Sequence, residues 1–155
     1  MELSLAETVL RLLAASAAGA IIGVNRDWER TPIGVRTLAL VALGAASITV
    51  AAIQAPGLAG QPDAYSRVVQ GVVQGIMGGI SFIGAGVILR DARQRSVHGL
   101  TTAAAVWVTA ALGVACGLGG WRTVLVGTVM AVLLLAGLTP LRRRVRGEAE
   151  EEKTG

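Results

Sequence analysis

The sequence predicts an all-α membrane protein, a bundle of about five transmembrane helices. Of its 155 residues, 53% are apolar and only 15% are charged, which is too apolar for an ordinary soluble domain. Charge-free runs recur, and the run Val68–Leu89 would reach roughly 33 Å as a helix, enough to cross a bilayer. Glycines crowd that run; in water each would weaken a helix by about 1 kcal/mol, whereas in lipid they let helix backbones approach closely.

Five apolar spans account for almost everything before residue 142. We expect helices at about 3–24, 35–53, 67–89, 98–116 and 121–138. Residues 1–141 are then one membrane domain, and residues 142–155 a charged, disordered cytoplasmic tail.

The first span, 3–24, carries two residues of opposite charge near its start. Glu7 and Arg11 lie four residues apart and are expected to pair. An alternative interpretation is a signal peptide, because Ala-Ser-Ala at residues 15–17 fits a cleavage site. We favour an uncleaved helix, since the chain begins Met-Glu and has no Lys or Arg before Arg11.

The second span, 35–53, follows a connector that Pro32 and Gly34 break. The next connector, 54–67, contains two prolines and two glycines and is predicted to form turns outside the membrane.

The third span, 67–89, has a glycine stripe beside a polar line of Gln70, Gln74 and Ser81. Because unpaired amides in lipid cost energy, we expect this side to face the other helices. A small, weakly polar stripe in the fourth span is its expected partner, and the fifth span, the most apolar, is expected to face lipid. The predicted helix-packing residues are Gly19, Gly23, Gly71, Gly75, Gly78, Gly84, Gly86, Thr102 and Thr109.

The basic residues predict the topology. Eleven of the 14 Lys and Arg residues lie in 26–36, in 90–95 and beyond residue 141, places that alternate with the spans. The positive-inside rule then places the N-terminus outside and the C-terminus in the cytoplasm. The same placement argues against nucleic-acid binding, despite the net charge of +4.

The two cytoplasmic connectors and the starts of the second and fourth spans are predicted to form one patch. Arginines and the amides of helix N-termini together suit an anion: a phosphate, a lipid headgroup or an acidic segment of a partner. The alternative is that the arginines only anchor the protein at the cytoplasmic face. The patch residues are Arg26, Asp27, Arg36, Thr37, Arg90, Asp91, Gly99 and Thr101.

Catalysis, cofactors and a metal site have no support in the sequence. There is no nucleophile elbow, no candidate triad and no metal-ligand spacing, and no carboxylate lies in the middle of a span. Backbone carbonyls at Gly78 and Gly79 are candidates to line a pore, although helix packing explains these glycines more simply.

Four segments resemble the signatures of the MgtC/SapB family. They are GAIIGVNR at 19–26, GVRTLALVALGAA at 34–46, SFIGAGVILR at 81–90 and VHGLTTAAAVW at 97–107. The departures are Asn25 in place of a usual glutamate, His98 in place of an arginine and Thr101 in place of an asparagine in some members. Longer members also carry a soluble C-terminal domain resembling ACT modules, which has no counterpart here.

The resemblance implies a multi-pass protein of the bacterial inner membrane that is not an enzyme. Its implied roles are adaptation to low magnesium, stress, virulence and survival inside host cells, through regulation of a membrane partner such as the ATP synthase or a cation pump. Self-association is also expected. The alternative function is a small magnesium or proton transporter or channel whose path is lined by the third and fourth helices.

Overall fold

The fold was obtained as a computed structural model that describes residues 3–28, 31, 33–58, 60–91 and 96–137. Within them the chain forms five helices: α1 (Leu5–Trp28), α2 (Val35–Ile53), α3 (Pro62–Val87), α4 (Leu100–Gly117) and α5 (Trp121–Gly137). Strands β1 (Leu89–Asp91) and β2 (Ser96–His98) pair antiparallel between α3 and α4. The predicted helical fold class is confirmed, because α1 to α4 are each long and apolar enough to cross a membrane and α5 is a shorter apolar helix.

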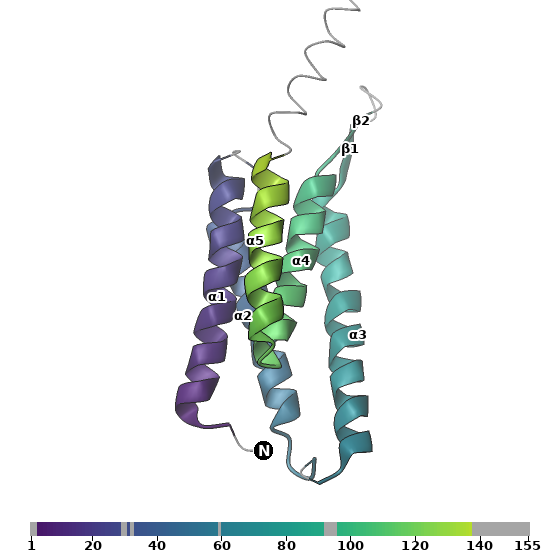
Figure 1. Cartoon of the computed structure of the whole chain (residues 1–155). Coiled ribbons are helices and arrows are strands. Elements are labelled where there is room, and N and C mark those ends of the chain that lie inside the picture. The colour runs from purple at the N-terminus through teal and green to yellow at the C-terminus, as the bar shows by residue number, and fades with distance from the viewer. Residues whose placement is uncertain (1–2, 29–30, 32, 59, 92–95, 138–155) are drawn as a thin grey trace, which may run out of the picture.

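The helices alternate in direction along the bundle (Figure 1). The end of α1, the start of α2, the β hairpin and the start of α4 therefore lie at one end, which we call the hairpin end. The N-terminus and the α2–α3 connection lie at the opposite end. This arrangement agrees with the expected placement of both basic connectors on one side. Which end faces the cytoplasm stays a prediction, and the predicted tail, 142–155, lies outside the described residues.

Helix α4 forms the centre of the bundle and packs on all four other helices, while α1 and α2 share the most extensive interface. The core is built largely of small residues, which lets these helices come close together. Fully buried members include Ala15, Ile22, Leu38, Ala42, Ala46, Val106, Ala110 and Cys116. Helix α3 is different: it packs on α4 and more sparsely on α2, and none of its residues is buried.

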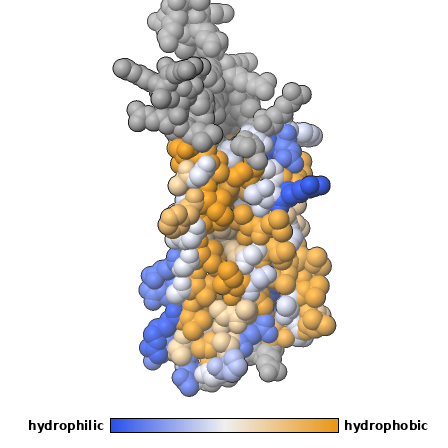
Figure 2. Space-filling view, turned by 180° about the vertical axis from the view of Figure 1, so that it is seen from behind, coloured by the Kyte–Doolittle hydropathy of each residue, from blue (hydrophilic) through white to orange (hydrophobic). Residues whose placement is uncertain are grey.

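The outside of the bundle is apolar. Phe82 is 84% exposed and Leu133 is 60% exposed, and large aliphatic side chains are exposed on every helix. Figure 2 shows hydrophobic side chains covering much of one face between the two ends. Such a surface matches the hydrocarbon of a bilayer, and the protein is a multi-pass membrane protein.

Prolines account for where two of the helices end or begin. The second helix covers residues 35–53, as predicted. The first helix continues to Trp28, since no helix breaker occurs before Pro32. The third helix begins at Pro62 and not near residue 67, because proline is well accommodated in the first turn of a helix.

A β hairpin stands where a plain connector was expected between the third and fourth spans, and α4 begins at Leu100, two residues after the expected start. Arg90 pairs with Val97 and Asp91 with Ser96 in the two-stranded hairpin. Gly99 then has a φ of 88°, a left-handed conformation that favours glycine, and α4 begins at the next residue. A β-carbon at Gly99 would also collide with the carbonyl of Val87, so this junction requires glycine.

Candidate functional site

Arg26 is the buried centre of the hairpin end. It lies in the last turn of α1 and is 3% exposed. Its Nη2 donates a hydrogen bond of 2.7 Å to Oγ1 of Thr102 on α4. A guanidinium in the last turn also complements the partial negative charge of the helix C-terminus. The side chain therefore ties α1 to α4 and does not present its charge at the surface.

The Asp27 carboxylate bonds to the start of α2. Its Oδ2 accepts a hydrogen bond of 3.2 Å from the backbone N–H of Val35. A side chain on Gly34 would occupy the space of the Asp27 carboxylate, which explains why glycine precedes this helix. The backbone N–H of Val35, which was predicted to be available to an external anion, is therefore bonded to a carboxylate of the chain itself.

Thr31 lies in the same connector and bonds to the end of α1. Its Oγ1 donates to the carbonyl of Arg26 at 2.9 Å, and its backbone N–H bonds the same carbonyl at 3.2 Å. These bonds satisfy a carbonyl in the last turn of α1, one of the groups that a helix end leaves without an intrahelical partner.

The remaining patch residues lie at the hairpin end, although their side chains do not form one described cluster. Arg36, Thr37 and Thr101 are exposed. Arg90 and Asp91 lie in β1, and their side chains are outside the described part of the chain. Arg26 is therefore buried and does not belong to an exposed anion patch. Anion binding by the exposed residues of the patch stays a proposal.

The predicted packing residues of α1 and α4 lie where helices approach closely or are buried. A β-carbon on Gly19 would collide with the carbonyl of Leu38, and one on Gly23 would lie 2.5 Å from the Cα of Val35. Thr102 and Thr109 are buried on α4. At these positions the absence of a side chain, or its small size, sets the distance between helices.

The glycines of α3 do not pack as expected within this chain. A β-carbon built on Gly71, Gly75, Gly78 or Gly86 would meet nothing within 4 Å, and one on Gly84 would only touch Ala103 at 3.7 Å. The expected close helix contact is therefore not made at these positions. Helix α3 packs on α4 and more sparsely on α2, which leaves open space beside this stripe.

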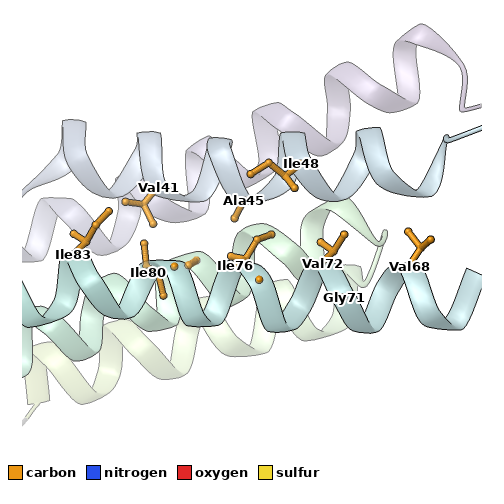
Figure 3. Close-up of a pocket in the computed structure, with 12 residues that line it drawn as sticks. Val41, Ala45, Ile48, Val68, Gly71, Val72, Ile76, Ile80 and Ile83 are labelled. Carbon is orange, nitrogen blue, oxygen red and sulfur yellow. The ribbon is translucent and has the colours of Figure 1, made fainter.

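An apolar groove of about 680 Å³ lies between α2 and α3. Figure 3 shows Val41, Ala45 and Ile48 of α2 facing branched side chains of α3 across it. Gly71, Gly75 and Gly79 line the groove as well. The glycine stripe is therefore an open, hydrocarbon-like surface at the edge of the bundle, a suitable contact for another apolar chain.

The small-residue face of the fourth span, expected to pack on the third span, meets α2 at Gly113, and the contacts of Gly117 were missed. Gly113 and Gly117 of α4 closely approach α2, where a β-carbon would collide with Ala42 and with Thr49, respectively. Arg11 pairs with Glu7 as predicted, with 2.9 Å between Nε and Oε1, and its Nη1 also donates to the carbonyl of Gly117 at 2.7 Å. Gly113 belongs to the small-residue face of the fourth span, which was the available signal; no sequence signal indicated the bond to Gly117.

Among the described residues, no three His, Cys, Asp or Glu side chains are grouped so that they could hold a metal ion. At the hairpin end, the arginine, aspartate and threonine contacts of the described side chains position the helix ends.

Comparison with known proteins gives the family. The family model for the MgtC family matches residues 12–144 of this chain. This chain belongs to the MgtC family. The assignment confirms the resemblance carried by the four motifs, and all four lie inside the matched range.

Similar MgtC-family proteins occur in several bacteria. The chain is 44% identical over 140 residues to protein SrpB of Synechococcus elongatus, covering 86% of this chain and 75% of that protein. It is 38% identical over 148 residues to protein MgtC of Salmonella paratyphi A, covering 94% of this chain and 59% of the relative. Against protein MgtC of Salmonella typhimurium, identity is 41% over 122 residues, covering 79% of this chain and 48% of the relative. No solved structure matches.

Proposed function

We propose that this protein is a non-catalytic regulator in the bacterial inner membrane that acts by helix–helix contact with a larger membrane protein. Membership of the MgtC family supports a role in growth at low magnesium, in stress and in survival inside host cells. The open glycine face of α3 is the single structural observation that carries the proposed mode of action.

The physical argument concerns what drives helices together in lipid. Lipid tails are as apolar as the helix surfaces, so association depends on close van der Waals packing and favours small residues. In this bundle α3 leaves glycines at 71, 75 and 79 open along the groove, one turn apart. A second helix from a partner would gain the close approach that α2 does not make.

The regulated partner is the finer part of the proposal. A larger complex such as the ATP synthase or a cation pump follows from the family resemblance. The positive-inside rule supports a cytoplasmic location for the hairpin end and an outside location for the N-terminus. The domain boundary at residue 141 and the cytoplasmic tail belong to the same proposal.

The experiment compares two leucine substitutions in native membranes at low magnesium. Gly75→Leu fills the open face of α3, whereas Gly44→Leu adds the same side chain to an exposed glycine near the middle of α2, where nothing lies within 4 Å. A larger membrane protein that co-purifies with the wild type and with Gly44→Leu, and is lost with Gly75→Leu, is the expected result. Equal recovery from both variants contradicts the proposal.

Liposome assays separate regulation from transport. Purified protein reconstituted in liposomes is expected to move neither magnesium nor protons. Robust flux that Gly75→Leu abolishes would replace the regulator by the alternative function, a small transporter whose path is lined by α3 and α4.

A further inference from the structure

A second pocket lies at the end of the bundle opposite the hairpin. Its volume is about 500 Å³, within the range of roughly 300–1,000 Å³ that is usual for small-ligand sites. Residues from the N-terminal segment, α1, the end of α2, the α2–α3 connection, the first turns of α3 and the α4–α5 turn line it. It is thus built by six segments at the level where the spans begin and end, the depth of lipid headgroups.

Arg11 supplies the charge of this pocket. Its side chain is 12% exposed and lines the pocket from α1. The guanidinium is held in place by its bonds to Glu7 and to the carbonyl of Gly117. These two bonds use two of its five N–H donors, so the group is oriented by the protein and keeps donors beyond those bonds.

The other polar lining groups point to the same chemistry. Gln61, Tyr65 and Ser66 contribute amide and hydroxyl donors, and no carboxylate is among the described residues that line the pocket. Leu3, Leu58 and Leu118 make an apolar wall beside them. The guanidinium is already paired with Glu7, so an anion joined to hydrocarbon would bind its remaining N–H donors and these neutral donors, beside the apolar wall.

We propose that this pocket binds the phosphate group of an anionic phospholipid, with Arg11 as the charged contact and the leucines against the glycerol and upper acyl region. Arginine matches phosphate oxygens in geometry and charge and keeps its charge at any physiological pH. This site lies at the opposite end from the hairpin and does not depend on the proposed regulatory function.

The test measures lipid binding to the purified full chain in a neutral detergent at 0.15 M salt, by native mass spectrometry. The probes are phosphatidylglycerol, phosphatidylcholine and inorganic phosphate. Wild type is expected to retain phosphatidylglycerol in preference to the other two. Arg11→Gln is expected to weaken that binding about tenfold or more, the usual effect of losing a hydrogen bond to a charged group.

Two further variants keep the test decisive. Ser66→Leu narrows the pocket without touching the described contacts of Arg11, and is expected to weaken phosphatidylglycerol severalfold even if Arg11→Gln fails to fold. Arg67→Gln removes the same charge from an exposed position outside the pocket lining and should leave binding within about twofold, since salt screens distant surface charges.

Three outcomes would overturn the proposal. Equal retention of phosphatidylcholine and phosphatidylglycerol would exclude recognition of an anionic lipid. Binding of inorganic phosphate as tight as that of the lipid would assign the pocket to free phosphate. Weakening by Arg67→Gln with none from Ser66→Leu would show that net surface charge, not this pocket, attracts the lipid.

Discussion

Gly19 on α1 provides the sharpest test of how this bundle is held together. In the structure a β-carbon at this position would lie 3.0 Å from the Cα of Ala39 and closer still to the carbonyl of Leu38. Carbon atoms in favourable contact are about 3.5–4.0 Å apart, so Gly19→Ala must push α1 away from α2 by roughly 0.5–1 Å. The obstructing atoms are backbone and cannot rotate out of the way.

The magnitude follows from that displacement. A gap of 0.5–1 Å forfeits about a quarter to a half of each van der Waals contact, and overpacking in a close-packed interior costs about 1–3 kcal/mol. Since α1 and α2 share the most extensive interface of the bundle, we expect Gly19→Ala to lower the free energy of unfolding by about 2–3 kcal/mol relative to the same substitution at an open helical glycine, which gains the same helix propensity.

Gly44→Ala on α2 is the matched control. Nothing lies within 4 Å of a β-carbon at Gly44, so the same change adds a methyl group to open space. Its higher helix propensity should leave stability unchanged or raise it by up to about 1 kcal/mol. The assay is unfolding in mixed micelles of a mild detergent and dodecyl sulfate, followed by far-ultraviolet circular dichroism. Equal unfolding free energies for the two variants would refute the argument that glycine at 19 sets the distance between α1 and α2.

Three more predictions concern the hairpin end. Thr102→Val, which keeps the side-chain shape and removes the bond to Arg26, should lower the unfolding free energy by about 1.5–3 kcal/mol in the same assay; a change below about 0.5 kcal/mol would contradict the described tie. Gly99→Ala should destabilise by at least about 1–2 kcal/mol because of its positive φ, and hydrogen exchange should show faster exchange in the first turn of α4; unchanged exchange would argue against the junction. Gly34→Ala should displace the Asp27 carboxylate and cost about 1 kcal/mol, and an unaltered exchange rate for the Val35 amide would contradict this contact.

Much of the fold follows from the hydropathy of the chain. Runs of apolar residues separated by basic connectors predict five spans and their alternation, and Gly34 and Pro32 locate the start of α2 within the sequence itself. The β hairpin between α3 and α4 was not predictable in this way. It joins residues 89–91 to residues 96–98 through pairing of backbone groups, and only the left-handed glycine at 99 leaves a trace in the sequence.

The site was predictable in its residues but not in their surroundings. A small-residue stripe indicates that a helix can be approached closely; it does not say by which helix. The stripe containing Gly19 and Gly23 meets α2, whereas the one containing Gly71 and Gly75 opens onto a groove. Similarly, the position of Arg26 at the end of a span suits either a surface charge or a buried tie. The hydroxyl of Thr102, which is distant in sequence, decides for the tie.

The proposal that the open face of α3 contacts a larger membrane protein is tested most directly by photo-crosslinking in living cells grown at low magnesium. A photoreactive amino acid at residue 75 reports on the glycine face, and the same group at residue 44 reports on an exposed glycine of α2. The account predicts a crosslink from residue 75 to one larger membrane protein that is absent from residue 44. Crosslinks from residue 75 only to lipid or to further copies of this chain, or the same product from both residues, would contradict it.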